Sequence, residues 1–176
     1  MHRRARQSYA VGGLGLFGAM LHALNHSIVK AMLFFTAGNI LARFRTKDTA
    51  KVQGVCSVLP ISGALWIAGF LAITGSPPFG TFISEFTILR ASLEQGRWVV
   101  AGLYSVFLLV IFVGMSIIVL RMALGQSEQS RTRESWTAVL SPLAFALLAL
   151  LLGLYLPAPL VDKLHGAADL LGGLAK

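Results

Sequence analysis

The feature that most constrains this chain is a run of 23 residues, Trp98 to Leu120, that contains no charged side chain. A helix needs about 20 consecutive apolar residues to cross the hydrocarbon core of a bilayer. A second run of this kind extends from Trp136 to Tyr155, and Pro157 and Pro159 come after it. Aromatic residues at the ends of such runs are typical of the membrane–water interface. The two runs therefore predict transmembrane helices.

The composition excludes a water-soluble enzyme, because only 12% of the residues are charged and soluble domains carry about 25%. The same shortage of polar residues excludes a disordered segment. The net charge is +8, yet the basic residues lie at the edges of apolar runs, where membrane proteins place them. We therefore expect no nucleic-acid partner. The single cysteine, Cys56, has no second cysteine for a disulfide, a redox pair or a metal pair.

Two less uniform stretches complete the expected membrane domain. One covers residues 17–42, and the other covers residues 60–93 and contains Gly75, Pro77 and Pro78. Proline lacks the backbone N–H and disfavours helix in the residue before it, so we expect the second stretch to form two half-helices. The prediction is an all-α, polytopic transmembrane helical bundle of about four spans in a single membrane domain, residues 1–176. The expected elements are spans at 17–42, 60–93 (broken at 75–78), 98–121 and 136–156, and a C-terminal amphipathic helix at 160–175.

The N-terminal region carries two further expectations. Residues 1–9 are expected to be a polar loop or terminus that is not cleaved. Gly13, Gly15 and Gly18 form a G-x-G-x-x-G string, but no strand precedes it as a dinucleotide site requires. A flexible turn and close packing between helices are the two interpretations. At the other terminus, the apolar stripe of residues 160–175 suits the membrane surface or a neighbouring subunit.

Five ionisable groups lie within the expected spans: His22, His26, Lys30, Glu85 and Arg90. The first three, here called the His–His–Lys row, are four residues apart and so share one face of a helix. Histidine titrates near neutral pH, and a lysine inside the bilayer needs water or a partner, so the row suits a proton relay. One alternative is hydrogen bonding to neighbouring helices, with Lys30 reaching the interface. Another is a metal site at the two histidines, for which no third ligand is evident.

Glu85 follows the Pro77-Pro78 break by about two turns of helix. A helix break leaves backbone groups unpaired, and these are tolerated at membrane depth only where protein or a water-filled cavity satisfies them. A carboxylate beside such a break indicates an ion path of the kind that transporters use. The alternative is that Glu85 only forms an ion pair with Arg90 near an interface.

Two stretches resemble a known family: LHALNHSIVKAMLFFTAGNI (residues 21–40) and LPISGALWIAGFLAITGSPPFGTFISEFTILR (residues 59–90). They are similar to antiporter-like proton-pumping proteins, which comprise large membrane subunits of respiratory complex I, multisubunit sodium/proton antiporters and membrane-bound hydrogenases. The second stretch looks most like the hydrogenase-4 component F branch, with complex I subunits of the M, N or L type as the alternative. The resemblance implies that Glu85 is the titratable residue of a broken helix. It also implies that the His–His–Lys row links a central relay to the outlet.

The resemblance implies the C-terminal portion of a proton-translocating subunit of a hydrogenase-4 or NADH:quinone oxidoreductase type complex, carrying part of a proton path. This would be a non-catalytic, multi-pass protein of the cell (inner) membrane, with loops 43–51 and 123–135 in the cytoplasm. Its expected partners are other membrane subunits, the lipid bilayer and protons, with sodium left open. No cofactor is expected in this chain, and iron–sulfur and metal centres are expected in partner subunits. The alternatives are a non-conducting structural or assembly subunit, a sodium/proton antiporter subunit, and an intramembrane enzyme with a metal at His22 and His26.

Overall fold

The computed structural model describes the backbone of residues 2–174 and the side chains of residues 13–172. Every regular element in this range is a helix, which confirms the all-α prediction. The helices are α1 (His2–Phe44), α2 (Val55–Val58), α3 (Pro60–Ile73), α4 (Gly80–Glu94), α5 (Trp98–Leu124), α6 (Trp136–Leu154) and α7 (Ala158–Leu174). In the described part of the chain, α1 from Gly13 onward, α5 and α6 are long and apolar enough to cross a membrane, and α3 is a shorter apolar helix.

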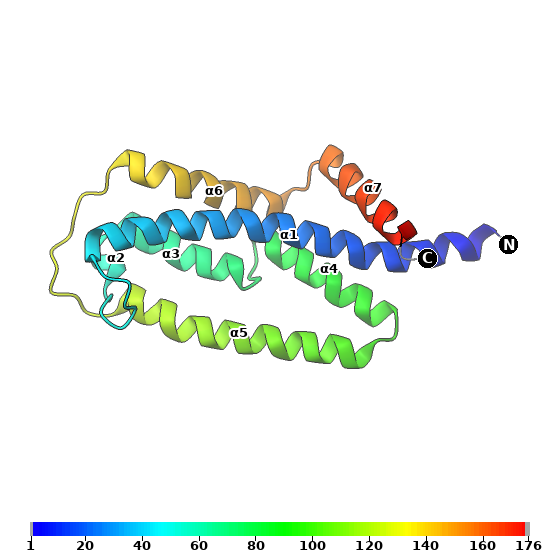
Figure 1. Cartoon of the computed structure of the whole chain (residues 1–176), viewed down its shortest axis with the longest axis horizontal. Coiled ribbons are helices and arrows are strands. Elements are labelled where there is room, and N and C mark those ends of the chain that lie inside the picture. Colours follow the sequence, from blue (N-terminus) through cyan, green and yellow to red (C-terminus); the bar gives the residue numbers. More distant parts are fainter. Residues whose placement is uncertain (1, 175–176) are drawn as a thin grey trace.

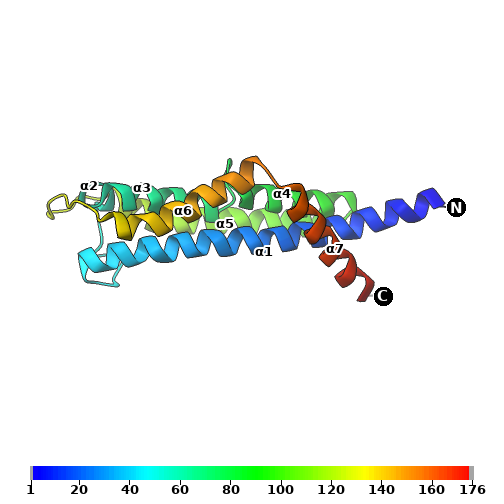
Figure 2. The same cartoon turned by 90° about the horizontal axis from the view of Figure 1, so that it is seen from above.

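The broken pair α3 and α4 forms the centre of the bundle. Figure 1 shows the two helices end to end, with α1 on one side of them and α5 on the other. α1 packs against α3, α4, α6 and α7, whereas α5 packs against α2, α3 and α4. Seen from above, α7 crosses α1 obliquely (Figure 2). Successive long elements alternate in direction, so the loop after α1 and the loop after α5 lie at the same end of the molecule (Figure 1).

The first helix differs from the expectation at its start. α1 begins at His2 instead of following a polar loop at residues 1–9, and it continues beyond the expected span 17–42. Arginine, alanine and glutamine are good helix formers, which accounts for the extension. The glycine string lies inside the helix, where a β-carbon on Gly18 would approach the Ile88 side chain of α4 to 3.0 Å. Of the two interpretations of these glycines, close packing between helices is the one that holds.

The chain leaves the helical conformation between α3 and α4, at residues 74–79. Gly75 has a positive φ of 67°, and the peptide bond between Pro77 and Pro78 is cis. Thr81 Oγ1 donates a hydrogen bond across the break to the carbonyl of Ala72 in the last turn of α3. The expected break residues therefore lie in a segment whose two flanking helices are tied together by a side chain.

The C-terminal helix α7 packs back onto this same chain. The ring of His165 stacks on Phe17 of α1 with 4.4 Å between the ring centroids, and Ala168 joins Phe17 and Leu21 in a buried cluster. Part of the apolar stripe expected at 160–175 is thus used inside the molecule, while Leu171 stays 48% exposed. Residue 175, the last of the expected helix, lies outside the described residues.

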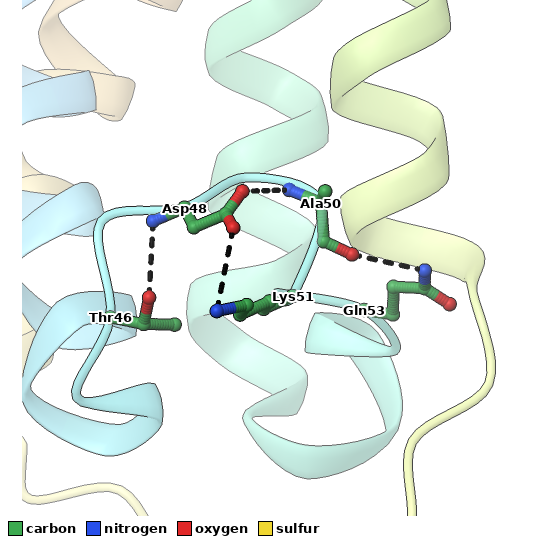
Figure 3. A network of polar contacts seen from close by, with 5 residues as sticks. All are labelled: Thr46, Asp48, Ala50, Lys51 and Gln53. Carbon is green, nitrogen blue, oxygen red and sulfur yellow. Dashed lines mark hydrogen bonds and ion pairs between the residues drawn. The ribbon is translucent and has the colours of Figure 1, made fainter.

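The loop between α1 and α2 is held by its own polar groups (Figure 3). The backbone N–H of Asp48 donates to Thr46 Oγ1 at 3.1 Å, and Asp48 Oδ1 accepts from the N–H of Ala50 at 3.0 Å. Lys51 Nζ lies 3.8 Å from Asp48 Oδ2. Gln53 Nε2 donates to the carbonyl of Ala50 at 3.3 Å. The positive charge of Lys51 therefore already has a partner within its own loop.

Candidate functional site

Glu85 lies against the helix break. Its side chain projects from α4 and is 8% exposed. A β-carbon at position 75 would overlap Glu85 Oε2, so only glycine leaves room for the carboxylate there. The positive φ of Gly75 is also a conformation that glycine adopts without strain. The break thus does two things at once, because it interrupts the helix and makes the space that the carboxylate occupies.

The carboxylate faces a cleft of about 350 Å³ between α4 and α5. Tyr104 of α5 also lines this cleft, and most of the remaining wall is apolar. Among the residues that the structure describes, no hydrogen bond or ion pair reaches the Glu85 carboxylate. Arg90 pairs instead with Glu94, with 2.7 Å between Nε and Oε1. The alternative in which Glu85 is simply the partner of Arg90 is therefore wrong.

The first histidine of the His–His–Lys row touches α4. His22 Nδ1 lies 3.1 Å from Ser84 Oγ, and Ser84 Oγ donates its proton to the carbonyl of Thr81 at 2.8 Å. The rings of His22 and His26 follow each other along α1, with 5.5 Å between their centroids.

The second half of the row faces a different surface. His26 and Lys30 line a groove of about 420 Å³ together with Trp66 of α3 and Met115 of α5. His26 Nδ1 is buried and has no partner within the described residues, whereas Lys30 is exposed, with its Nζ 5.9 Å from the Phe34 ring centroid.

The three side chains of the row therefore do not share one surface of the folded chain: His22 contacts α4, whereas His26 and Lys30 line the groove. The cause is helical drift: at 3.6 residues per turn, each step of four residues rotates about 40° around the axis. Over two steps the row turns from the α4 interface into the groove.

The structure does not bring all the expected site residues into contact. Ser84 and Glu85 are neighbours in α4, but successive helical residues point about 100° apart. His22 therefore reaches Ser84 on the α1 side, while Glu85 faces the break and the cleft beside α5. The candidate site thus consists of two polar halves, one on the α1 side of α4 and one on the side of the break and α5.

Sequence reasoning missed two residues of this region, Asn25 and Tyr104. Asn25 is 1% exposed, and its Nδ2 donates to the carbonyl of Gly80 at 2.9 Å, next to the break. Asn25 Oδ1 is buried without a partner in the described part of the chain. A sequence signal existed for both residues. Asn25 is a polar residue three positions after His22 in an apolar helix, and Tyr104 is the only tyrosine in the uncharged run of α5.

Comparison with known proteins places these features in a family. Residues 7–112 match the family model described as NADH:quinone oxidoreductase/Mrp antiporter, TM. A hydrogenase-4 component F homolog from Methylacidiphilum infernorum is 29% identical over 93% of this chain and 34% of its own length. NADH-quinone oxidoreductase subunit N from Desulforudis audaxviator is 35% identical over 51% of this chain and 18% of its own length. The chain thus spans about a third, or less, of the curated relatives that it matches.

A solved structure shares the fold. A chain in the Mrp complex from Dietzia sp. DQ12-45-1b superposes with a TM-score of 0.76 over 89% of this chain and 37% of that chain, at 22% sequence identity. The match to the family model covers more than half of the sequence and includes α3, α4 and both halves of the site. The resemblance drawn from residues 21–40 and 59–90 is thereby confirmed. The chain belongs to the NADH:quinone oxidoreductase/Mrp antiporter transmembrane family.

Proposed function

We propose that this chain is the C-terminal portion of a proton-translocating, antiporter-like membrane subunit of a hydrogenase-4 or NADH:quinone oxidoreductase type complex, and that it carries part of the proton path. The observation that carries the proposal is Glu85. It is a buried carboxylate held against a helix break, with no hydrogen-bonding or ionic partner among the described residues. A carboxylate without a fixed partner is free to take up and release a proton, whereas an ion-paired one is held in its charged form.

The His–His–Lys row supplies the second part of the proposed path. His22 contacts Ser84 beside Glu85, and His26 and Lys30 open into the groove between α1, α3 and α5. Protons would pass between Glu85 and Lys30 through His26, His22 and water, because no hydrogen bond among the described residues joins the two halves. The redox centres that drive the transport would belong to partner subunits in the cell (inner) membrane, and this chain would supply no cofactor.

Glu85→Gln in the complete complex tests the proposal. The substitution keeps the shape of the side chain and removes its titration, so we expect proton pumping per assembled complex to be lost or strongly reduced while the amount of assembled complex stays near normal. Glu85→Asp keeps a carboxylate with a shorter reach and should retain part of the activity. The measurement is proton flux and complex abundance in the same membranes.

Glu94→Gln is the matched control. Glu94 lies at the end of the same helix, is paired with Arg90, and should tolerate the change with normal pumping. Normal pumping by Glu85→Gln would contradict the proposed path. Reduced assembly with normal pumping per complex would instead favour a non-conducting structural subunit. A requirement for sodium in the flux assay would favour the sodium/proton antiporter alternative.

A further inference from the structure

A second polar site lies at the end of the bundle that holds the loops after α1 and α5 (Figure 1). A cleft of about 420 Å³ opens there between the start of α3 and the end of the loop that leads to α6. Its lining includes Ile61, Arg131, Arg133, Glu134 and Trp136. The proton path proposed above does not involve this cleft.

The loop segment that forms the cleft is fixed in place by backbone contacts. The N–H of Thr132 donates to the carbonyl of Val58 at 2.8 Å. Glu134 Oε1 accepts from the N–H of Ile61 at 2.6 Å, and Glu134 Oε2 accepts from the N–H of Ser62 at 3.0 Å and from the Ser62 hydroxyl. This segment, residues 131–135 and here called the strap, is thus held across the first turn of α3. Glu134 accepts hydrogen bonds from backbone N–H groups that the start of a helix leaves free.

The strap turns two arginines outward. Along residues 131–135 the side chains alternate between half-buried and exposed, so that Thr132 and Glu134 face the bundle while Arg131 and Arg133 are exposed. Neither arginine has an ion pair or hydrogen bond with any described residue, in contrast to Lys51 with Asp48 and Arg90 with Glu94. The one carboxylate in the cleft, Glu134, is engaged with α3. The cleft therefore presents two guanidinium groups that form no ion pair with a described residue, and its lining keeps an excess of positive charge, two arginines against one glutamate.

The rest of the wall places this cleft at the membrane surface. Trp136 opens α6 and is 74% exposed, and Ile61 is 40% exposed. An exposed tryptophan at the first residue of a membrane-spanning helix is typical of the headgroup layer. Two free guanidinium groups beside an apolar wall match an anionic phosphate group that carries acyl chains, because arginine binds phosphate oxygens through paired N–H donors.

We propose that this cleft binds the headgroup phosphate of an anionic phospholipid. Arg131 and Arg133 contact the phosphate, and the acyl chains lie along Ile61 and Trp136. The lipid bridges the start of α3 and the start of α6, the two elements that the strap already holds together. This site is independent of proton transport, and it stands if the proposed path through Glu85 fails.

The test measures the binding of a short-chain phosphatidylglycerol to the detergent-solubilised full chain by native mass spectrometry. Each basic residue near an anionic surface strengthens binding about fivefold, so Arg131→Gln combined with Arg133→Gln should weaken it about twenty-five-fold. The matched control is Arg90→Gln with Arg97→Gln, which removes the same charge at the opposite end and should bind as the unchanged chain does. Arg131→Lys with Arg133→Lys keeps the charge and loses the paired donors, so it should bind more tightly than the glutamine variant and less tightly than the unchanged chain, which separates loss of charge from loss of fold.

Other arms of the experiment distinguish the source of the phosphate. Phosphatidylcholine should bind weakly and equally to all variants, and inorganic phosphate should compete with phosphatidylglycerol without matching its affinity. Inorganic phosphate that binds as tightly as the lipid would overturn the lipid assignment in favour of a free-anion site. Equal binding of phosphatidylglycerol to the glutamine variants and the unchanged chain would overturn the site itself. Loss of lipid binding when the complete complex is used would overturn it in favour of an acidic segment of a neighbouring subunit.

Discussion

α1 and α5 are both long and apolar enough to cross a membrane, but their polar groups are used differently. α1 directs Asn25 and His22 into α4, where they bond to Gly80 and Ser84. α5 has few polar groups, and its serines bond to their own helix. Ser116 Oγ, for example, donates to the carbonyl of Phe112 at 2.6 Å. The polar groups of α1 therefore bond to a neighbouring helix, whereas the serines of α5 are satisfied within their own helix.

The difference shows what each helix contributes. Polar side chains at membrane depth are costly unless protein or water meets them, so those of α1 indicate which of its faces lies against α4. α5 instead presents an uninterrupted apolar face, which suits lipid or an apolar subunit surface. Its most exposed members are Trp98, Val99, Phe107, Leu109, Val110, Ile117 and Leu124.

The largest effect that would test this comparison is expected for a charge placed on α5. Val110 is near the middle of α5 and 61% exposed, so Val110→Lys should make insertion less favourable by about 2.5–3.5 kcal/mol. Val110→Leu should leave insertion unchanged. Glycosylation mapping of the full chain measures the fraction of molecules in which α5 crosses the membrane. Unchanged insertion of the lysine variant would mean that this face of α5 meets water or a polar partner.

Alanine substitutions of two glycines should have a smaller effect, and they compare the packing around Gly80, at the α1 interface, with the packing around Gly114 of α5. A β-carbon on Gly80, at the α1 interface, would approach Asn25 Oδ1 to 2.6 Å, whereas one on Gly114 of α5 would have nothing within 4 Å. Gly80→Ala should therefore lower the free energy of unfolding by about 1–3 kcal/mol through overpacking. Gly114→Ala should leave it unchanged or raise it by up to about 1 kcal/mol, since alanine is the better helix former. Unfolding of the detergent-solubilised chain in a denaturing detergent measures both, and equal effects would contradict the contrast.

The sequence predicts those features that depend on local composition. The uncharged run places α5 at Trp98–Leu124, where the expected span was 98–121, because apolar length alone determines such a helix. Gly75, Pro77 and Pro78 lie between α3 and α4 for a similar local reason, since proline cannot continue a helix. The sequence predicts less well which surface each side chain of a helix faces. Lys30 shares a row with His22 in the sequence, but helical drift leads it into the groove.

Features that depend on distant partners could not be read from the sequence. Glu134 belongs to a polar loop, and nothing near it in sequence indicates that it satisfies backbone N–H groups at the start of α3. Glu85 is evident as a buried acid, but its fit against Gly75 depends on how the chain turns at the break. In the same way, the docking of α7 on α1 through His165 and Phe17 joins residues from opposite ends of the chain.

The smallest effect, and the most specific one, concerns Asn25 itself. Asn25→Ala removes its hydrogen bond to the Gly80 carbonyl and should lower the free energy of unfolding by about 1 kcal/mol, the usual size of such a bond between membrane helices. Ser116→Ala on α5, which breaks a bond within one exposed helix, should change it much less.

The double variant of Asn25 and Gly80 tests whether these two residues are in direct contact. If Gly80→Ala destabilises the chain because its new methyl group presses on the Asn25 amide, truncating Asn25 relieves that pressure. Asn25→Ala combined with Gly80→Ala should then lower the free energy of unfolding by less than the sum of the two single changes, as residues in direct contact do. Simple additivity would mean that the methyl group is accommodated elsewhere, and that α1 and α4 are not held together at this point by the fit of Asn25 against Gly80.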